Sequence, residues 1–425
     1  MNRKDIAAAV LFSLATSTAL AGDRINGPMS FEPIPRSAEI GALPLDAPLA
    51  IPRGFHQRVV SDESDLDIYP GKPDWNDMNT VNETGKDAGR YLYRTHEVRP
   101  YRFGGINNFI AAGGGAVSVV DLKTGKARVL AQRGDWEALD GRVWTPWPPL
   151  LFAEEVNSDT GLPIPDPDAP GASDGLLSEI RFADCAPATA AEITVRPLLG
   201  SLAHVGIEVD RQGRVYVIDE HSNGSIYRFV PASPGDLGTG QLYALKVEDG
   251  DAGNGTGGAS WVALDMQQVP ASGRIAASRA GASRYNRPED LEIIGDRLYV
   301  AITGEDRVLS VSLDGNPVVR EFIAAGRNAP VEASERTGFR KPDNLAADAA
   351  GNLWIAEDNV PSDIWVAAPD ASGDGYADRV GLFGSLSTPG AEATGIYFGT
   401  DSRTLFVNIQ HSADANDKTL AITRE

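Results

Sequence analysis

A repeated unit of two short strands is the feature of this sequence that most limits its fold. Each unit has an apolar strand, a turn containing Gly or Asp, and a second strand, and the units occupy residues 115–131, 208–230, 292–313, 346–367 and 396–410. The second strand of the last four units is built on an aromatic residue: Tyr216, Tyr299, Trp354 and Phe406. No stretch of residues 81–425 keeps a helical period over three turns. Repetition of one such unit predicts an all-β fold and favours a β-propeller over a sandwich with similar strands.

The spacing of the units suggests how the chain is divided. The aromatic residues are unevenly spaced, so we expect loop insertions at residues 157–200 and 231–285, which are rich in Gly, Pro and Ala. Residues 22–80, rich in Pro, Asp and Gly, are predicted to form an extended N-terminal arm. Residues 81–425 are then predicted to form a single propeller domain.

Residues 1–21 have the pattern of an export signal. Arg3 and Lys4 precede an apolar run at residues 6–15, and Ala19-Leu20-Ala21 is a small-residue cleavage pattern. The apolar run is shorter than the roughly 20 residues of a membrane span. A membrane anchor or a disordered tail is the alternative interpretation. We therefore expect a cleaved signal peptide and a mature protein that is periplasmic or secreted and has no membrane span.

The formal net charge of −21 limits the partners of the chain. Such a protein is repelled by nucleic acids and by anionic membrane surfaces. An anionic substrate would need a local positive centre, which a bound cation could supply. Cys185 is the only cysteine of the sequence, so no internal disulfide can form, and it has no nearby partner that would make it a nucleophile.

Acidic residues recur at matched positions of two units. Pro288-Glu289-Asp290 and Pro342-Asp343-Asn344 each stand just before the first strand of a unit, with the acid ten residues before Tyr299 and eleven before Trp354. Equivalent positions of propeller units surround the central channel, where converging carboxylates repel one another unless a cation lies among them. Turn residues and strand-end caps are the alternative, because Asp and Asn commonly fill both.

More acids stand where strands are predicted to end. They are Glu154, Glu155, Asp219, Glu220, Glu357 and Asp358. Adjacent strand residues point to opposite faces, so at most one of each pair is expected to face the channel. An oxygen-rich ligand set favours calcium, with iron or manganese as further candidates. Zinc is not expected, because no histidines have HxxxH or HxH spacing; His204 and His411 are the two near unit edges.

A separate calcium candidate follows the fourth unit. Asp370, Ser372, Asp374 and Asp378 match positions one, three, five and nine of an EF-hand-type loop, and Gly375 matches position six. Gly381 stands where such loops usually have Glu. Any calcium bound by this loop would be structural.

Several stretches carry a family resemblance through their order in the chain. They are WTPWPPLLFAEE (144–155), SLAHVGIEVD (201–210), GSIYRFVPASPGDLGTGQLYAL (224–245), NRPEDLEI (286–293), KPDNLAADAAGNLWIAEDN (341–359), and EATGIYF with SRTLFVNIQH (392–411). Together they resemble the PhoX-type alkaline phosphatase family over roughly residues 90–420. The stretch at 342–359 also resembles propeller lactonases of the gluconolactonase type.

The PhoX resemblance implies a six-bladed propeller whose axial cluster of calcium and iron ions hydrolyses phosphate esters in an exported enzyme. A metal-bound oxygen would attack phosphorus, and no residue of the chain would act as nucleophile. By position, the implied metal ligands are Glu154, Glu155, Glu289, Asp290, Asp343, Asn344 and Glu392. Secondary candidates are His204, Glu208, Asp219, Glu220, Asp358 and His411.

Two positions depart from the family pattern. Ala153 stands where the family commonly has Cys, and Val205 follows His204 where the family has Glu, with Glu208 three residues further on. The first departure bears on the iron site. Three functions therefore stay open: a calcium-dependent phosphatase acting as a monomer on a small phosphorylated substrate, a calcium-dependent lactonase, and a non-catalytic exported binding propeller that has lost the iron site.

Overall fold

The computed structural model describes most of the chain. The described residues are 24–68, 75–85, 87–98, 114–147, 149–155, 168–183, 187–248, 254–331, 337–414 and 416–424. The predicted signal peptide and Cys185 lie outside them. Within these residues, no helix is both long and apolar enough to cross a membrane.

Strands make up nearly all of the regular structure in the described residues. The first thirteen are β1 (Leu49–Ala50), β2 (Phe55–Asp62), β3 (Asn76–Val81), β4 (Tyr91–His96), β5 (Ala116–Asp121), β6 (Lys126–Gln132), β7 (Leu139–Trp144), β8 (Pro149–Glu154), β9 (Leu177–Phe182), β10 (Ala190–Val195), β11 (Ile207–Val209), β12 (Val215–Ile218) and β13 (Ile226–Pro231). The others are β14 (Gly240–Val247), β15 (Gly257–Ala263), β16 (Pro288–Ile294), β17 (Arg297–Ile302), β18 (Arg307–Ser312), β19 (Val318–Ala324), β20 (Pro342–Ala347), β21 (Leu353–Glu357), β22 (Asp363–Ala367), β23 (Val380–Leu386), β24 (Glu392–Phe398), β25 (Thr404–Gln410) and β26 (Lys418–Arg424).

Helices are short in the described chain. Helix α1 (Gly273–Ala280) begins at Ser272, whose side chain accepts a hydrogen bond from the N–H of Ile275, and ends at Gly281 with φ 72°. Two 3₁₀ turns, Pro197–Leu199 and Thr303–Glu305, complete the helical structure. The all-β prediction is confirmed, since a single α-helix accompanies the strands of the described residues.

The strands form five sheets, and every pair of named strands is antiparallel. Three of the sheets have four strands and one has five. The nine-stranded sheet consists of two runs, β11 to β15 and β16 to β19, that join where Gly257 and Gly258 of β15 pair with β19.

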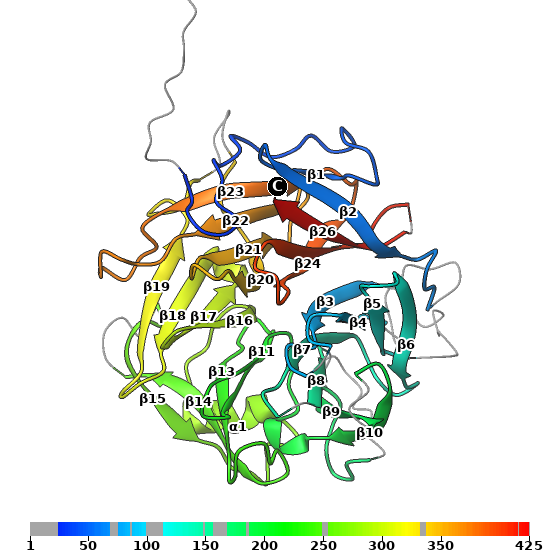
Figure 1. Cartoon of the computed structure of the whole chain (residues 1–425). Coiled ribbons are helices and arrows are strands. Elements are labelled where there is room, and N and C mark those ends of the chain that lie inside the picture. The colour runs from blue at the N-terminus through cyan, green and yellow to red at the C-terminus, as the bar shows by residue number, and fades with distance from the viewer. Residues whose placement is uncertain are drawn as a thin grey trace, which may run out of the picture.

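The sheets are arranged in a ring, as Figure 1 shows. The innermost strands β3, β7, β11, β16, β20 and β24 each contact the next, and β24 contacts β3 again. The N-terminal strand β2 pairs with the C-terminal strand β26, so the two ends of the chain complete one sheet. This arrangement brings the starts of the innermost strands together around one axis.

Three expected boundaries need correction. The segment predicted as an arm contributes β1 and β2 to sheets, and its boundary at residue 80 falls inside β3. The predicted insertion at 157–200 contains β9 and β10, and the one at 231–285 contains β14, β15 and α1. These outer strands are partly exposed, for example β10 and β15, so their sequences lack the apolar alternation of the inner strands.

The core lies between neighbouring sheets. The aromatic residues that mark the units are all buried, with exposed fractions of 0% for Tyr216 and Trp354, 4% for Phe406 and 7% for Tyr299. The Trp354 ring packs edge-on against Phe383 at a centroid distance of 4.6 Å. Burial of such a side chain contributes roughly 2–3 kcal/mol, so the repeated aromatic residue stabilises the contact between adjacent sheets.

Candidate active site

A β-bulge occurs in five innermost strands, directly after the first residue in β3, β7, β16 and β20 and after the third residue in β24. The pairing of β3, β7, β16, β20 and β24 with the following strand shifts register after the first residues. Four of these bulges contain an acid as their first residue: Asp77, Asp140, Glu289 and Asp343. A bulge re-aims its side chains, and bulges are common beside active sites. The repeated bulge therefore directs four carboxylates from different strands toward the axis.

The residue before each of these four strands has an uncommon backbone conformation. Trp75, Ala138, Arg287 and Lys341 have positive φ angles of 43°, 43°, 54° and 42°. Their carbonyl oxygens accept hydrogen bonds of 2.9–3.1 Å from the N–H groups of Glu97, Glu155, Thr303 and Asp358, respectively. A left-handed non-glycine residue costs about 1–2 kcal/mol. The turn thus holds the residue that follows the second strand beside the bulged acid.

The bulged carboxylates raise one another's pKa. Burial, followed by the charges of Glu392 and Glu155, raises the pKa of Asp77 to about 7. Burial and then the charges of Asp77 and Glu155 raise the pKa of Asp140 well above its ordinary value. Burial and the charges of Glu392 and Asp77 do the same for the pKa of Asp343. These carboxylates form one acidic cluster with those of Glu155, Glu220, Glu289, Asp358 and Glu392. We call it the channel cluster.

Arg287 supplies positive charge to one side of the channel cluster. Its guanidinium donates to Glu220 at 2.8 Å and lies 3.4 Å from both Glu289 and Asp358. Burial, followed by the charge of Asp343, nevertheless raises the pKa of Glu289 well above its ordinary value. Burial and the charges of Glu289 and Glu155 raise the pKa of Glu220 in the same way. One arginine is thus too little to neutralise the acids on this side.

His411 lies on the other side of the channel cluster. Its Nε2 is 3.2 Å from Oε1 of Glu392 and 3.9 Å from Oε2 of Glu97. Burial alone would lower the pKa of His411, but the hydrogen bond and charge of Glu392 raise it above its ordinary value. The Trp75 ring packs against the imidazole at a centroid distance of 5.1 Å.

The structure brings some of the predicted site residues together and not others. Glu155, Glu289, Asp343 and Glu392 belong to the channel cluster, as do Glu220, Asp358 and His411 from the secondary set. Glu154, Asp290 and Asn344 instead accept hydrogen bonds from backbone amides. The Asp290 carboxylate accepts hydrogen bonds from the N–H groups of Leu291 and Leu345. The Glu154 carboxylate accepts hydrogen bonds from the N–H groups of Glu137 and Leu176. The side-chain oxygen of Asn344 accepts a hydrogen bond from the N–H of Gly395. Asp290 therefore links β16 to β20, and Asn344 links β20 to β24.

The remaining secondary candidates lie in other surroundings. Asp219 is buried and accepts two hydrogen bonds of 2.6 Å from Arg274. His204 is buried with its Nε2 3.0 Å from the Gly200 carbonyl oxygen, and burial lowers the pKa of His204 to about 4. Burial, followed by the charges of Asp290 and Glu83, raises the pKa of Glu208 to about 8. Glu208 pairs with Tyr216 as Glu292 pairs with Tyr299, and Glu292 lies beyond the bulge of β16. Glu208 therefore lies further along the axis than the bulged acids.

Sequence reasoning missed Asp77, Asp140 and Arg287. Both aspartates occupy the bulge position of Glu289 and Asp343, but they follow Asn76 and Leu139 instead of a proline. The spacing to the next aromatic residue also differs in these units. A search for any acid at the second residue of each innermost strand would have found them.

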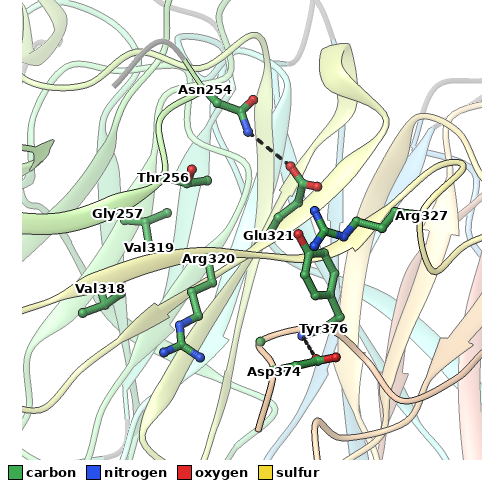
Figure 2. Close-up of a pocket in the computed structure, with 11 residues that line it drawn as sticks. Asn254, Thr256, Gly257, Val318, Val319, Arg320, Glu321, Arg327, Asp374 and Tyr376 are labelled. Atoms are coloured by element: carbon green, nitrogen blue, oxygen red, sulfur yellow. Dashed lines mark hydrogen bonds between the residues drawn. The ribbon is translucent and has the colours of Figure 1, made fainter. Parts of the chain in front are cut away.

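The EF-hand-like loop is closed by its own hydrogen bonds. Asp370 accepts from the N–H groups of Gly373, Asp374 and Gly375 at 2.7–3.1 Å. Asp378 accepts from the N–H groups of residues 371 and 372 at 3.3 Å. Figure 2 shows that Asp374 and Tyr376 of this loop line a groove of about 500 Å³ with Arg320 and Arg327. The groove lies beside β19, and none of the channel-cluster acids lines it.

The donor set of the channel cluster suits calcium but not a thiolate-held iron. Among the described residues, no three His, Cys, Asp or Glu side chains stand close enough to hold a metal ion in their present rotamers. Buried, mutually repelling carboxylates with one arginine nevertheless match the oxygen ligands that calcium prefers. Ala153 is buried and carries no thiolate, so a thiolate-held iron does not fit.

The comparison with known protein families settles the family of the chain. The model of the family described as alkaline phosphatase PhoX matches residues 184–322 and 313–413, which is more than half of the chain. The chain belongs to the PhoX alkaline phosphatase family. The PhoX match contains the bulges of β16 and β20 and the strand β24, and therefore Glu289, Asp343 and Glu392.

A solved PhoX structure has the same fold as this chain. Pseudomonas fluorescens PhoX, determined with vanadate as a transition-state analogue, is 19% identical with a TM-score of 0.66, covering 94% of this chain and 98% of that one. A putative gluconolactonase is 13% identical with a TM-score of 0.49, covering 92% and 98%. A Xanthomonas campestris gluconolactonase is 14% identical with a TM-score of 0.47, covering 95% and 100%. A search of curated protein sequences finds no match.

Proposed function

We propose that this PhoX family member is an exported, calcium-dependent phosphatase that hydrolyses phosphate mono- or diesters at the channel cluster. The observation that carries the proposal is the convergence of Asp77, Asp140, Glu289 and Asp343 from four strands onto one axis, beside Arg287. We infer that the six innermost strands correspond to six blades, with the nine-stranded sheet counting as two. The export signal and a periplasmic or secreted location rest on the sequence of residues 1–21.

The residues that would hold calcium are acids of the channel cluster whose charges act on one another. They are Asp77, Asp140, Glu155, Glu220, Glu289, Asp343 and Glu392. Bound calcium would supply the positive charge that neutralises these carboxylates and the phosphate oxygens. Asp290, Asn344 and Glu154 would hold the strands that present the ligands, through the amide contacts already described. Iron is not part of the proposal, because Ala153 offers no thiolate.

Arg287 would orient the phosphate. The Arg287 side chain is 38% exposed, and Glu220 and Glu289 fix the position of its guanidinium. A guanidinium has five N–H donors, so N–H groups remain that can donate to a phosphate. In the reaction, the oxygen of water forms a bond to phosphorus as the ester P–O bond breaks, and the leaving oxygen takes up a proton. The acidic residues around the site would carry the released protons away.

The proposal is tested with the purified full chain. We expect p-nitrophenyl phosphate hydrolysis that disappears in excess chelator and returns with calcium, together with calcium in the metal analysis of the protein. Glu289→Gln and Asp343→Asn should each lower kcat/KM roughly 100-fold with an unchanged circular dichroism spectrum. Asp374→Asn, in the separate loop, is the matched control and should retain activity.

Other results would identify the competing functions. Full activity in chelator would exclude the metal-dependent mechanism. Hydrolysis of a lactone but of no phosphate ester would identify a lactonase. Calcium binding without either activity would identify a binding protein.

A further inference from the structure

Four structurally equivalent residues flank the acids of the channel cluster in the chain. They are the left-handed residues Trp75, Ala138, Arg287 and Lys341, each directly before an innermost strand, and we call these places the rim positions. One residue separates each rim position from the acid at the start of the following bulge, and that acid belongs to the channel cluster. An exposed side chain at such a position is therefore placed to contact the part of a ligand that extends beyond the cluster.

Two neighbouring rim positions are cationic. Arg287 precedes β16 and Lys341 precedes β20, and these two strands contact each other. Both side chains reach Asp358: Arg287 lies 3.4 Å from its carboxylate, and the Lys341 Nζ lies 3.2 Å from its carbonyl oxygen and 3.8 Å from its carboxylate. Their side chains are 38% and 49% exposed. Both positively charged rim side chains thus lie on one side of the channel cluster, beside the acids Glu220, Glu289 and Asp358.

The rim position of β3 is aromatic. Around the ring, β24 separates β20 from β3, so Trp75 lies away from the cationic side. The Trp75 ring is half-buried and packs on the His411 imidazole, which is held in turn by Glu392 at 3.2 Å. The two rings are tilted by 57° to each other, and a partly exposed indole can stack with a further planar group. The fourth rim residue, Ala138, is small and fully buried, and carries no chemistry of its own.

We propose that the rim selects phosphate esters with a planar aromatic leaving group. Arg287 and Lys341 receive the phosphate charge, and the Trp75 ring packs against the aromatic group. The inference rests on the proposed phosphatase function and adds the class of substrate to it. Trp75 and Lys341 are specificity residues here, and the chemistry remains with the channel cluster.

Trp75→Leu tests the aromatic side. We expect it to lower kcat/KM for phenyl phosphate about tenfold through KM, and to change kcat/KM for ethyl phosphate less than about twofold. Trp75→Phe should retain most of the phenyl phosphate activity. Trp147→Leu is the matched control, because Trp147 is a half-buried tryptophan beyond the far end of β7 against Gly213 and Gly235. Equal losses for both substrates in Trp75→Leu would overturn the proposal.

Lys341→Asn tests the cationic side. Asparagine tolerates the left-handed backbone, so the substitution removes charge without adding strain. We expect a roughly tenfold higher KM for both substrates, an effect that weakens at high salt, and recovery in Lys341→Arg. Lys123→Asn, in the exposed turn between β5 and β6, is the control. An unchanged KM in Lys341→Asn would contradict the assignment of this side to the phosphate.

Binding separates this inference from the proposed function. Calorimetry with phenylphosphonate and ethylphosphonate, which cannot be hydrolysed at a P–O ester bond, reports selectivity without turnover. Preferential binding of phenylphosphonate that is lost in Trp75→Leu supports the rim even if no ester is hydrolysed. Hydrolysis of both esters with equal phosphonate affinities would leave the phosphatase standing and reject the rim.

Discussion

Glu289 and Asp290 are adjacent, yet their carboxylates have opposite surroundings. Both are buried, with exposed fractions of 6% and 3%. Asp290 accepts the N–H groups of Leu291 and Leu345 at 2.7–2.8 Å, and burial raises the pKa of Asp290 only to about 6 because these bonds oppose the rise. Glu289 faces Asp343 and its pKa rises well above the ordinary value. One carboxylate therefore stabilises the fold, and the other destabilises it until a cation is present.

We expect opposite stability changes from substituting these two residues. Asp290→Ala leaves two buried amides unpaired and should lower the free energy of unfolding by about 2 kcal/mol or more. Glu289→Gln removes a repelled charge and should leave the metal-free protein equally or more stable. Urea denaturation in chelator measures both variants. Similar losses in the two would show that Glu289 also serves the fold.

The turn into four of the innermost strands is the element that builds the channel cluster. Its left-handed residue, its bulge and the amide of the residue after the second strand recur in β3, β7, β16 and β20. Only the backbone geometry is repeated, since the rim side chains differ. The element fixes the directions of the acids, while the rim position is free to determine specificity.

Ala138→Gly tests the strain in this turn. Glycine adopts φ 43° without a Cβ clash, so we expect a gain of about 1 kcal/mol in the free energy of unfolding. Ala127→Gly, in the ordinary strand β6, should instead cost about 1 kcal/mol. A loss at both positions, measured by thermal denaturation, would contradict the strain argument.

At the scale of the whole molecule, the ring concentrates like charges at its axis. The pKa of Asp77 is raised to about 7 and that of Glu208 to about 8, chiefly by burial, and Asp140, Glu289 and Asp343 shift in the same direction. The folded protein then holds protons that the unfolded chain has released. Stability must fall as pH rises from the ordinary carboxyl pKa toward these raised values.

His204 acts with the opposite sign. Burial lowers the pKa of His204 to about 4 in the folded protein. The stability that neutral His204 contributes is therefore complete above the ordinary histidine pKa, and it is lost as the pH falls from there toward about 4. The carboxylates outnumber this single histidine. We expect the metal-free protein to be more stable at about pH 5.5 than at about pH 8, by on the order of 3 kcal/mol. Calorimetry in chelator checks the sign, and added calcium should remove most of the difference.

The variant Asp77→Asn is the control for the pH dependence of stability. Asp77→Asn removes one titrating group and should reduce the slope between these pH values without changing the fold. Greater stability at pH 8 than at pH 5.5 in chelator would show that the cluster is neutralised by the chain itself.

Local sequence determined the strands and the positions of several channel acids. The buried aromatic residues Tyr216, Tyr299, Trp354 and Phe406 mark real strands, because alternation within a strand needs no knowledge of its partners. Glu289 and Asp343 could be placed beside each other because both follow a proline at the start of equivalent units.

Tertiary structure decided which acid of each pair faces the axis and which further residues join it. The bulges turn Glu289 inward and leave Asp290 for the backbone, and a bulge depends on the register with a partner strand. Asp77 and Asp140 joined the cluster through the same register, without any matching local motif. Two strands of the predicted arm, β1 and β2, formed because the edges of the distant strands β23 and β26 accepted them, which only the closed ring could specify.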